Sequence, residues 1–274
     1  MARLELLVLD FDGTFTRVDD EAAPFLVAYR AGLAAVLGEP VDEAWERARR
    51  TIEADPDRYG WEHEGRIVAP AHADPYILAT TIAQLLLAER GLDRTVTERL
   101  YREAYAKAGI AFRHDAREVV EAALDTGVPV FVVTNSRTTD VVAKIARLEA
   151  RGSERLVVRG DACKWMITAA SRADPRFDAL PDEQHVPGLR RPILLKRGRY
   201  FDTLATLWAE TGASPEGTLV CGDIYELDLA LPAALGARVH MVGRPSTPEY
   251  ERAAVLRAGG TFSLELSGLL PALA

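Results

Sequence analysis

The sequence has very little cysteine. Only Cys163 and Cys221 occur among its 274 residues, and they do not form a CxxC pair. Two separated thiols are too few for a disulfide framework or for a cysteine-based metal site. We therefore expect a protein of the reducing cytoplasm.

Long apolar runs and an excess of positive charge are also missing. No apolar stretch approaches the length that spans a bilayer, and the N-terminus lacks the pattern of a secretory signal. The chain has 33 basic and 41 acidic residues, which gives a net charge of −8. These features argue against a membrane protein and against a surface for nucleic acid. A small charged molecule, which needs only a local positive pocket, is the expected partner.

What the sequence does contain is typical of a soluble globular protein. Hydrophobic residues make up 48% and charged residues 27% of the chain. At this length one large core, or a core with a smaller satellite domain, is possible. We expect two domains and leave the oligomeric state open.

Residue periodicity predicts where the two domains lie. The apolar run 6–9 reads as a buried parallel strand that ends at Asp10. Strand-helix alternation resumes after 115, which predicts a parallel sheet with helices on both faces. The fold class is therefore α/β, with a doubly wound parallel-sheet core from residues 1–16 and 115–274.

The segment 17–114 predicts an all-helical cap inserted after the first strand. Amphipathic patterns give helices at 23–37, 42–54, 76–90 and 97–108. The stretch 55–75 between them has three prolines, and we interpret it as a loop. A second irregular stretch, 163–192, predicts a further insertion within the core.

Polar residues follow four apolar runs of the predicted core. In parallel sheets the carboxyl ends of strands carry the ligand site, so these residues are the candidates for function. They are Asp10-Phe11-Asp12-Gly13-Thr14, Thr134-Asn135-Ser136, Lys196, and Gly222-Asp223 with Asp228.

In this order the four segments resemble the signature motifs of the haloacid-dehalogenase-like (HAD) superfamily. The motifs are DxDGT, a strand ending in Thr or Ser, a Lys, and GDxxxxD. Each is weak alone, but the set is specific and covers the whole core. The resemblance implies a phosphatase with a helical cap of the C1 type, which opens for substrate exchange and closes to exclude water.

The residue types suit phosphoryl transfer. A carboxylate at Asp10 can attack phosphorus and form an aspartyl-phosphate. Asp12 can protonate the leaving alcohol and later deprotonate the attacking water. Thr134 and the amides that follow it, including that of Asn135, can hold phosphate oxygens at a helix start. Lys196 would neutralise the charge that develops on Asp10 and the phosphate.

A hard cation must offset the paired carboxylates and the phosphate, and Mg²⁺ prefers such oxygen ligands. The resemblance implies that Asp10, Asp223 and the Asp12 main-chain carbonyl hold it, with Gly222 as support. We expect Asp228 to orient the lysine or a metal-bound water.

Two residues are candidates for the lysine of the third signature motif. In the family a Pro usually follows this lysine, but Lys196 is followed by Arg197-Gly198-Arg199. Lys164, which also follows an apolar strand, is the rival. We favour Lys196 for its distance ahead of Asp223. Arg197 contacts phosphate or belongs to a solvated basic face.

The expected function is Mg²⁺-dependent hydrolysis of a small phosphorylated metabolite. A phosphomutase or phosphotransferase would retain every motif, and a non-catalytic phospholigand-binding protein would be expected to lose one. The loop residues Tyr59, Trp61, His63 and Glu64 either reach the leaving group or pack within the cap. His114 is expected to be a hinge or surface residue.

Overall fold

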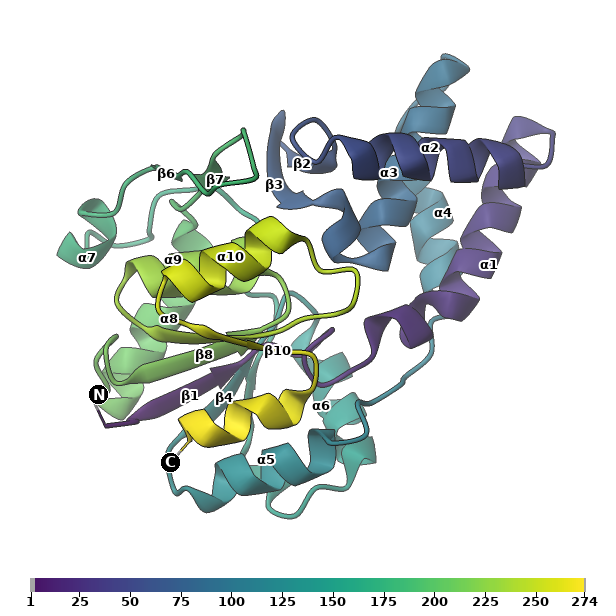
Figure 1. Ribbon diagram of the computed structural model, residues 1–274. Helices are drawn as coiled ribbons and strands as arrows, with labels where there is room; N and C mark the ends of the chain where they lie inside the picture. Colours follow the sequence, from purple (N-terminus) through teal and green to yellow (C-terminus); the bar gives the residue numbers. More distant parts are fainter. Residues whose placement is uncertain (1–2, 274) are drawn as a thin grey trace. The chain divides into compact units, whose positions relative to one another are not determined.

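The chain divides into two compact units in the computed structural model, which describes residues 3–273 (Figure 1). The core unit comprises Met1–Thr16 and Phe112–Ala274, and the cap unit comprises Arg17–Ala111. Thr16 and Phe112 form an antiparallel bridge, so the two ends of the discontinuous core unit meet. The cap unit thus ends at 111, where the sequence predicted 114.

The core unit is built on a six-stranded sheet with the order β10-β9-β8-β1-β4-β5, and every neighbouring pair in it is parallel. This confirms the predicted α/β class with a parallel sheet and a helical insertion. β10 was not predicted. The strands are β1 (Leu6–Leu9), β4 (Val130–Val133), β5 (Val157–Arg159), β8 (Thr218–Gly222), β9 (Arg238–Val242) and β10 (Thr261–Ser263).

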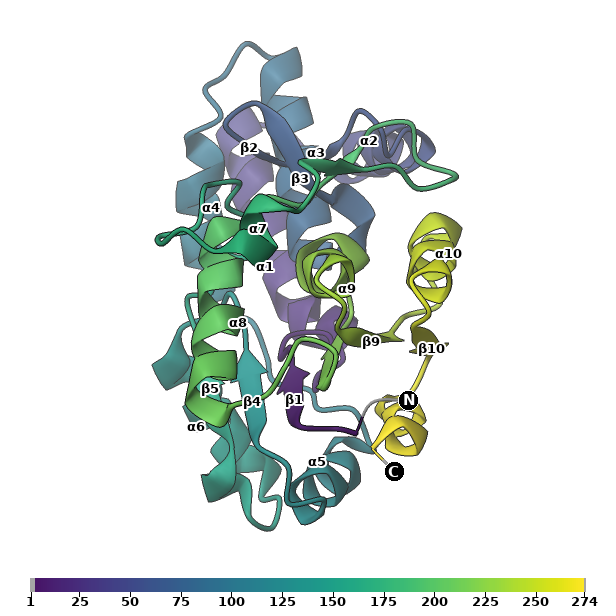
Figure 2. The same cartoon turned by 90° about the vertical axis from the view of Figure 1, so that its left-hand side faces the viewer.

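Apolar side chains of β1 alternate between two hydrophobic clusters. Leu6 and Val8 belong to one, and Leu7 and Leu9 belong to the other, as the period of two in a strand requires. Both faces of the sheet are therefore covered. The first cluster takes side chains from α8 (Gly198–Thr211), α9 (Ala230–Ala234) and α10 (Glu249–Arg257), and the second from α5 (Ala116–Asp125), α6 (Thr138–Leu148) and η4 (Leu266–Ala272). η4 lies beside α5 in both views (Figures 1 and 2).

The cap unit has four helices at the positions that periodicity predicted. They are α1 (Val18–Leu37), α2 (Asp42–Ala54), α3 (Pro75–Glu89) and α4 (Val96–Tyr105). Stacked aromatic rings such as Phe25 and Tyr29 fill its own core. Among residues 3–273 no single helix is long and apolar enough to cross a membrane; the pair α1 and α2 passes that test together but is bent by 111°.

The predicted loop 55–75 was wrong in its central part, which forms an antiparallel hairpin. Its strands are β2 (Gly60–His63) and β3 (Arg66–Pro70), followed by the short helix η1 (Ala71–Ala73). Glu64 and Gly65, at φ 50° and 73°, make the turn. Two left-handed residues suit the turn of a two-residue hairpin, but Glu-Gly is a weaker signal than Asn-Gly.

The segment 163–192 contains α7 (Pro175–Asp178) and β6 (Glu183–Gln184). β6 pairs antiparallel with β7 (Ile193–Leu194) in a separate two-stranded sheet. The prediction that 193–195 is a strand of the main sheet was therefore wrong. Two-residue strands can satisfy each other locally, and the apolar run alone cannot tell the two sheets apart.

Candidate active site

Asp10 stands at the centre of the carboxyl edge of the sheet. It follows β1, which lies between β4 and β8, and its amide donates to the Cys221 carbonyl at 2.8 Å. The residue is only 8% exposed, and Oδ2 accepts a hydrogen bond from the Thr14 hydroxyl at 3.2 Å. Asp10 is thus a buried carboxylate at the point where the ends of three strands meet.

Asp12 is held by side chains from the segment after β4. The Ser136 hydroxyl donates to Asp12 Oδ2 at 2.6 Å, and the Thr134 hydroxyl lies 3.4 Å from the same oxygen. Lys144 Nζ, from α6, lies 3.4 Å from Oδ1. The structure therefore brings Thr134 to Asp12, as adjacent parallel strands require. The Asn135 side chain instead accepts from the Lys164 amide at 2.8 Å.

Lys164 is the lysine that reaches the carboxylates. Its Nζ lies 2.8 Å from Asp10 Oδ1 and 2.8 Å from Asp228 Oδ1, and it is 1% exposed. Lys196 Nζ instead donates to the carbonyls of Phe177 and Asp178, at 2.6 and 3.2 Å. The placement of Lys196 beside Asp10 was wrong because β7, which precedes it, belongs to the small separate sheet.

The loop that carries Lys164 is fixed by unusual backbone and by a buried guanidinium. Asp161 and Cys163 have φ of 52° and 46°, a region that non-glycine residues occupy at a cost and often near functional sites. Arg197 is 0% exposed and donates to the Lys164 and Leu194 carbonyls at 2.8 and 2.9 Å. Of the two roles expected for Arg197, the solvated basic face was therefore wrong, because its guanidinium braces this loop inside the core unit.

Burial and the neighbouring Lys164 ammonium shift the pKa of Asp10 in opposite directions. Burial raises the pKa of Asp10 to about 7, although the Lys164 ammonium acts to lower it. Burial alone would lower the pKa of Lys164, but the Asp10 and Asp228 carboxylates outweigh it and the pKa is raised. The ammonium stays charged, and the negative charge on Asp10 is only partly compensated. A cation beside Asp10 would complete the compensation.

Two glycines allow the acidic side chains to come close. A Cβ on Gly13, whose φ is +80°, would overlap the Asp223 carboxylate, and a Cβ on Gly222 would overlap the Asp228 side chain. Asp228 lies in η3 (Tyr225–Leu229), a π-helical turn. Such turns often occur at functional sites.

Oxygen atoms of Asp10, Asp223 and Asp228 lie within 4.8 Å of one another, and all three residues are buried. An all-oxygen donor set of this kind fits Mg²⁺. Asp228 already accepts from Lys164 at 2.8 Å and from the Ile224 amide at 3.0 Å. Asp228 therefore holds the lysine, as expected, and the assignment of Asp10 and Asp223 as metal ligands stays a prediction.

Three residues of the site were missed by sequence reasoning. Ser136 followed directly from the strand-end argument but was given no role. Lys144 could have been found, because it neighbours the buried face of α6 formed by Val141 and Ile145. Arg113 gave no local signal; its guanidinium donates to the Gly13 carbonyl, 2.8 Å from Nη2, and braces the loop after β1.

Comparison with known proteins identifies the fold. No protein-family model and no curated protein matches the sequence. The chain is similar to the crystal structure of a predicted phosphoglycolate phosphatase from Haemophilus somnus. The two are 13% identical, with a TM-score of 0.58 and 100% of both chains covered. The magnesium-bound HAD-hydrolase YfnB from Bacillus subtilis is 14% identical, with a TM-score of 0.54 over 99% of both chains. A HAD family hydrolase from Deinococcus radiodurans, with bound phosphate and sodium, is 17% identical, with a TM-score of 0.54 over 100% of this chain and 96% of that one.

Proposed function

Because the chain has the haloacid-dehalogenase-like hydrolase fold with a helical insertion, we propose that it is a Mg²⁺-dependent phosphohydrolase. It cleaves a small phosphomonoester through an aspartyl-phosphate on Asp10. The observation that carries the proposal is the contact of buried Lys164 with both Asp10 and Asp228, at 2.8 Å each. These two contacts place the Asp10 carboxylate, the proposed nucleophile, beside a fixed positive charge at the edge of the sheet.

In the first half-reaction an Asp10 oxygen attacks phosphorus and the bond to the leaving alcohol breaks. Asp12 donates a proton to that alcohol oxygen. The hydrogen bonds from Ser136 and Thr134 to Asp12 Oδ2 hold its carboxyl group in one orientation before substrate arrives. Asp12 is therefore the acid, and Asp10 is the nucleophile.

In the second half-reaction Asp12, now deprotonated, takes a proton from water as the water oxygen attacks phosphorus. The Asp10–phosphorus bond breaks, and inorganic phosphate leaves. Lys164 stays within hydrogen-bond distance of Asp10 and offsets negative charge in both steps. The Thr134 hydroxyl and the Asn135 amide hold phosphate oxygens.

Asp10, Asp223 and the Asp12 main-chain carbonyl would hold Mg²⁺, which supplies charge neutralisation for the phosphate. Support comes from the clustering of buried Asp10 and Asp223 oxygens and from the raised pKa of Asp10, whose burial leaves it short of positive charge. The magnesium bound by YfnB adds to this support.

The proposal is tested by measuring phosphate release from a panel of phosphomonoesters, with Mg²⁺ and with chelator. Asp10→Asn keeps the size of the side chain and removes the nucleophile, so turnover should be lost. The matched control Asp182→Asn changes an exposed aspartate of the same unit and should keep full turnover. Isomerisation of a sugar phosphate in place of phosphate release would assign a phosphomutase. No turnover on any substrate would contradict catalysis.

A further inference from the structure

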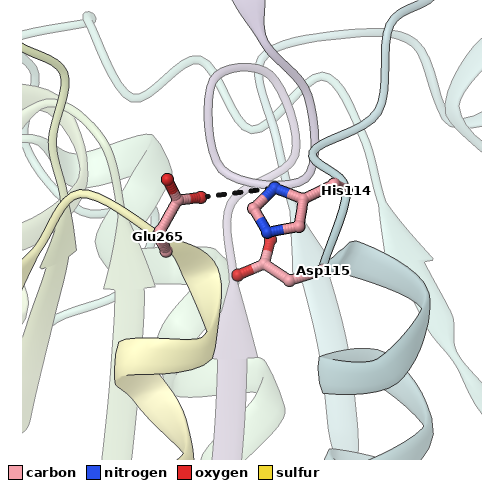
Figure 3. A group of neighbouring side chains, drawn as sticks. All are labelled: His114, Asp115 and Glu265. Atoms are coloured by element: carbon pink, nitrogen blue, oxygen red, sulfur yellow. Dashed lines mark ion pairs between the residues drawn. The ribbon is translucent and has the colours of Figure 1, made fainter.

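A second group of potential metal ligands lies elsewhere in the core unit. His114, Asp115 and Glu265 each offer one ligand atom, and these atoms lie within 4.8 Å of one another. His114 and Asp115 precede α5, while Glu265 precedes η4 (Figure 3). His114 Nδ1 lies 3.6 Å from Glu265 Oε2. Residues from the two ends of the core's second segment thus converge on one point.

Asp115 supplies an independent sign that this group takes a ligand. The residue is 6% exposed, and its Oδ2 accepts from the Ser267 amide at 2.7 Å. Its Oδ1 is buried, and no residue among 3–273 forms a hydrogen bond with it. An unsatisfied buried carboxylate oxygen is unfavourable unless a cation or donor meets it.

The guanidinium of the adjacent residue, Arg113, makes its hydrogen bonds elsewhere. Arg113, the preceding residue, directs Nε and Nη2 to the Gly13 carbonyl and Nη1 to the Leu264 carbonyl, at 3.1, 2.8 and 2.8 Å. Its donors are therefore used on main-chain oxygens. One carboxylate oxygen of Asp115 lies within 4.8 Å of ligand atoms of both His114 and Glu265.

We propose that His114, Asp115 and Glu265 bind a divalent transition-metal ion of the Zn²⁺ type. One imidazole nitrogen and two carboxylate oxygens form a ligand set that suits Zn²⁺, whereas the all-oxygen group around Asp10 suits Mg²⁺. The His114 and Glu265 side chains, 78% and 55% exposed, can turn to bring the ligand atoms closer. Water would complete the coordination.

The ion would join the start of α5 to the start of η4. These two helices already pack against each other, and the Ser267 amide is tied to Asp115. An ion that binds only the folded chain stabilises it by an amount that rises with the logarithm of the free ion concentration above the dissociation constant. The site therefore acts as a structural clamp, and it does not depend on the proposed phosphatase chemistry.

The test is a Zn²⁺ titration by calorimetry of the full chain in Mg²⁺-containing buffer, paired with thermal unfolding. Wild type should bind one more Zn²⁺ per chain than His114→Ala, and Zn²⁺ should raise its unfolding midpoint. Glu265→Gln, which alters an exposed side chain, should weaken binding at this site about tenfold or more. Both variants should retain the metal-free midpoint of wild type.

His185→Ala is the matched control, because His185 is also an exposed histidine of the core unit. It should keep the wild-type stoichiometry. X-ray absorption at the zinc edge should show imidazole nitrogen in wild type and lose it in His114→Ala. Equal Zn²⁺ binding by wild type and His114→Ala, or loss of binding in His185→Ala, would overturn the proposal.

Discussion

Lys164 and Lys196 carry the same charge in very different surroundings. Lys164 contacts two carboxylates and is buried, whereas Lys196 donates to the Phe177 and Asp178 carbonyls. Lys164→Met should reduce phosphate release by about 10²–10³-fold, because a preorganised charge at the reacting group is removed. Lys196→Met should leave the rate within about twofold, because the Lys196 Nζ donates to main-chain carbonyls and not to Asp10.

Protein stability must be followed in the same two variants. Lys164→Met leaves Asp10 and Asp228 buried without their cation, which should cost roughly 3–5 kcal/mol of unfolding free energy. The rate is therefore compared at a temperature where circular dichroism shows both variants to be folded. A folded Lys164→Met enzyme with full activity, or an inactive folded Lys196→Met enzyme, would reverse our assignment.

His240 makes the stability of the core unit depend on pH. Its ring is 1% exposed and lies 2.7 Å from the Thr261 hydroxyl and 3.0 Å from that of Ser263. Burial lowers the pKa of His240 from 6.5 to about 4. Between these values the unfolded chain binds a proton that the folded chain does not. Stability should therefore fall as pH drops from 6.5 towards 4.

The measurement compares wild type with His240→Gln, which cannot titrate, by urea unfolding in chelator. Above pH 6.5 the difference in unfolding free energy should be constant. Towards pH 4 the wild-type advantage should shrink by an amount of roughly 3 kcal/mol, since the pKa moves from 6.5 to about 4. A difference that does not change with pH would mean that His240 titrates normally in the folded chain.

The sequence predicts which residues meet at the sheet edge where their position follows from the strand itself. Asp10, Thr134 and Asp223 come directly after buried parallel strands, so they meet at one edge once the sheet forms. Lys164 lies five residues beyond the end of β5 at Arg159, and left-handed residues at 161 and 163 set its direction. The conformation of such a loop depends on contacts with residues distant in the sequence, such as Arg197, and no local sequence pattern reveals these contacts.

At the scale of the element, the loop after β1 requires a glycine at 13. Gly13→Ala places a methyl group against the Asp223 carboxylate and forces alanine into φ +80°. The left-handed backbone alone costs roughly 1–2 kcal/mol. We expect the displaced carboxylate to raise the Mg²⁺ concentration needed for half-maximal activity, measured by Mg²⁺ titration of phosphate release.

Gly127→Ala separates backbone strain from the contact with Asp223. Gly127 has φ +74°, but nothing lies within 4 Å of an added Cβ. This variant should lose similar stability and keep the wild-type Mg²⁺ dependence. If both alanines alter the Mg²⁺ dependence equally, general loosening of the fold would explain the effect, and the close approach of Gly13 to Asp223 would not matter.

Elements with strong periodicity were predicted well, and short ones were not. The cap helices α1 to α4 are each ten or more residues long, and α2 and α4 hold a distinct apolar face, which a helical period reveals. β7 and β10 have only two and three residues, too few for a period. The hairpin of β2 and β3 was hidden by the neighbouring prolines and by its Glu-Gly turn. Pairing partners, rather than local preference, decide the structure of such segments.

At the scale of the whole molecule, the cap unit is an insertion whose removal should leave a foldable core unit. The cap unit, Arg17–Ala111, has its own hydrophobic cluster. Thr16 and Phe112 are bridged as antiparallel neighbours, so a short Gly-Ser turn can join them without strain. Compact units with adjacent ends commonly tolerate excision.

We expect the joined core unit to unfold cooperatively, with the near-ultraviolet circular dichroism of a fixed aromatic environment. The parallel sheet and both of its apolar faces come entirely from residues outside 17–111, so its hydrophobic clusters remain complete. The cap unit expressed alone should also show the near-ultraviolet signal of fixed aromatic rings, because its cluster lies within one continuous segment. A core unit that is compact but lacks near-ultraviolet signal, as in a molten globule, would mean that the sheet depends on the cap for fixed packing.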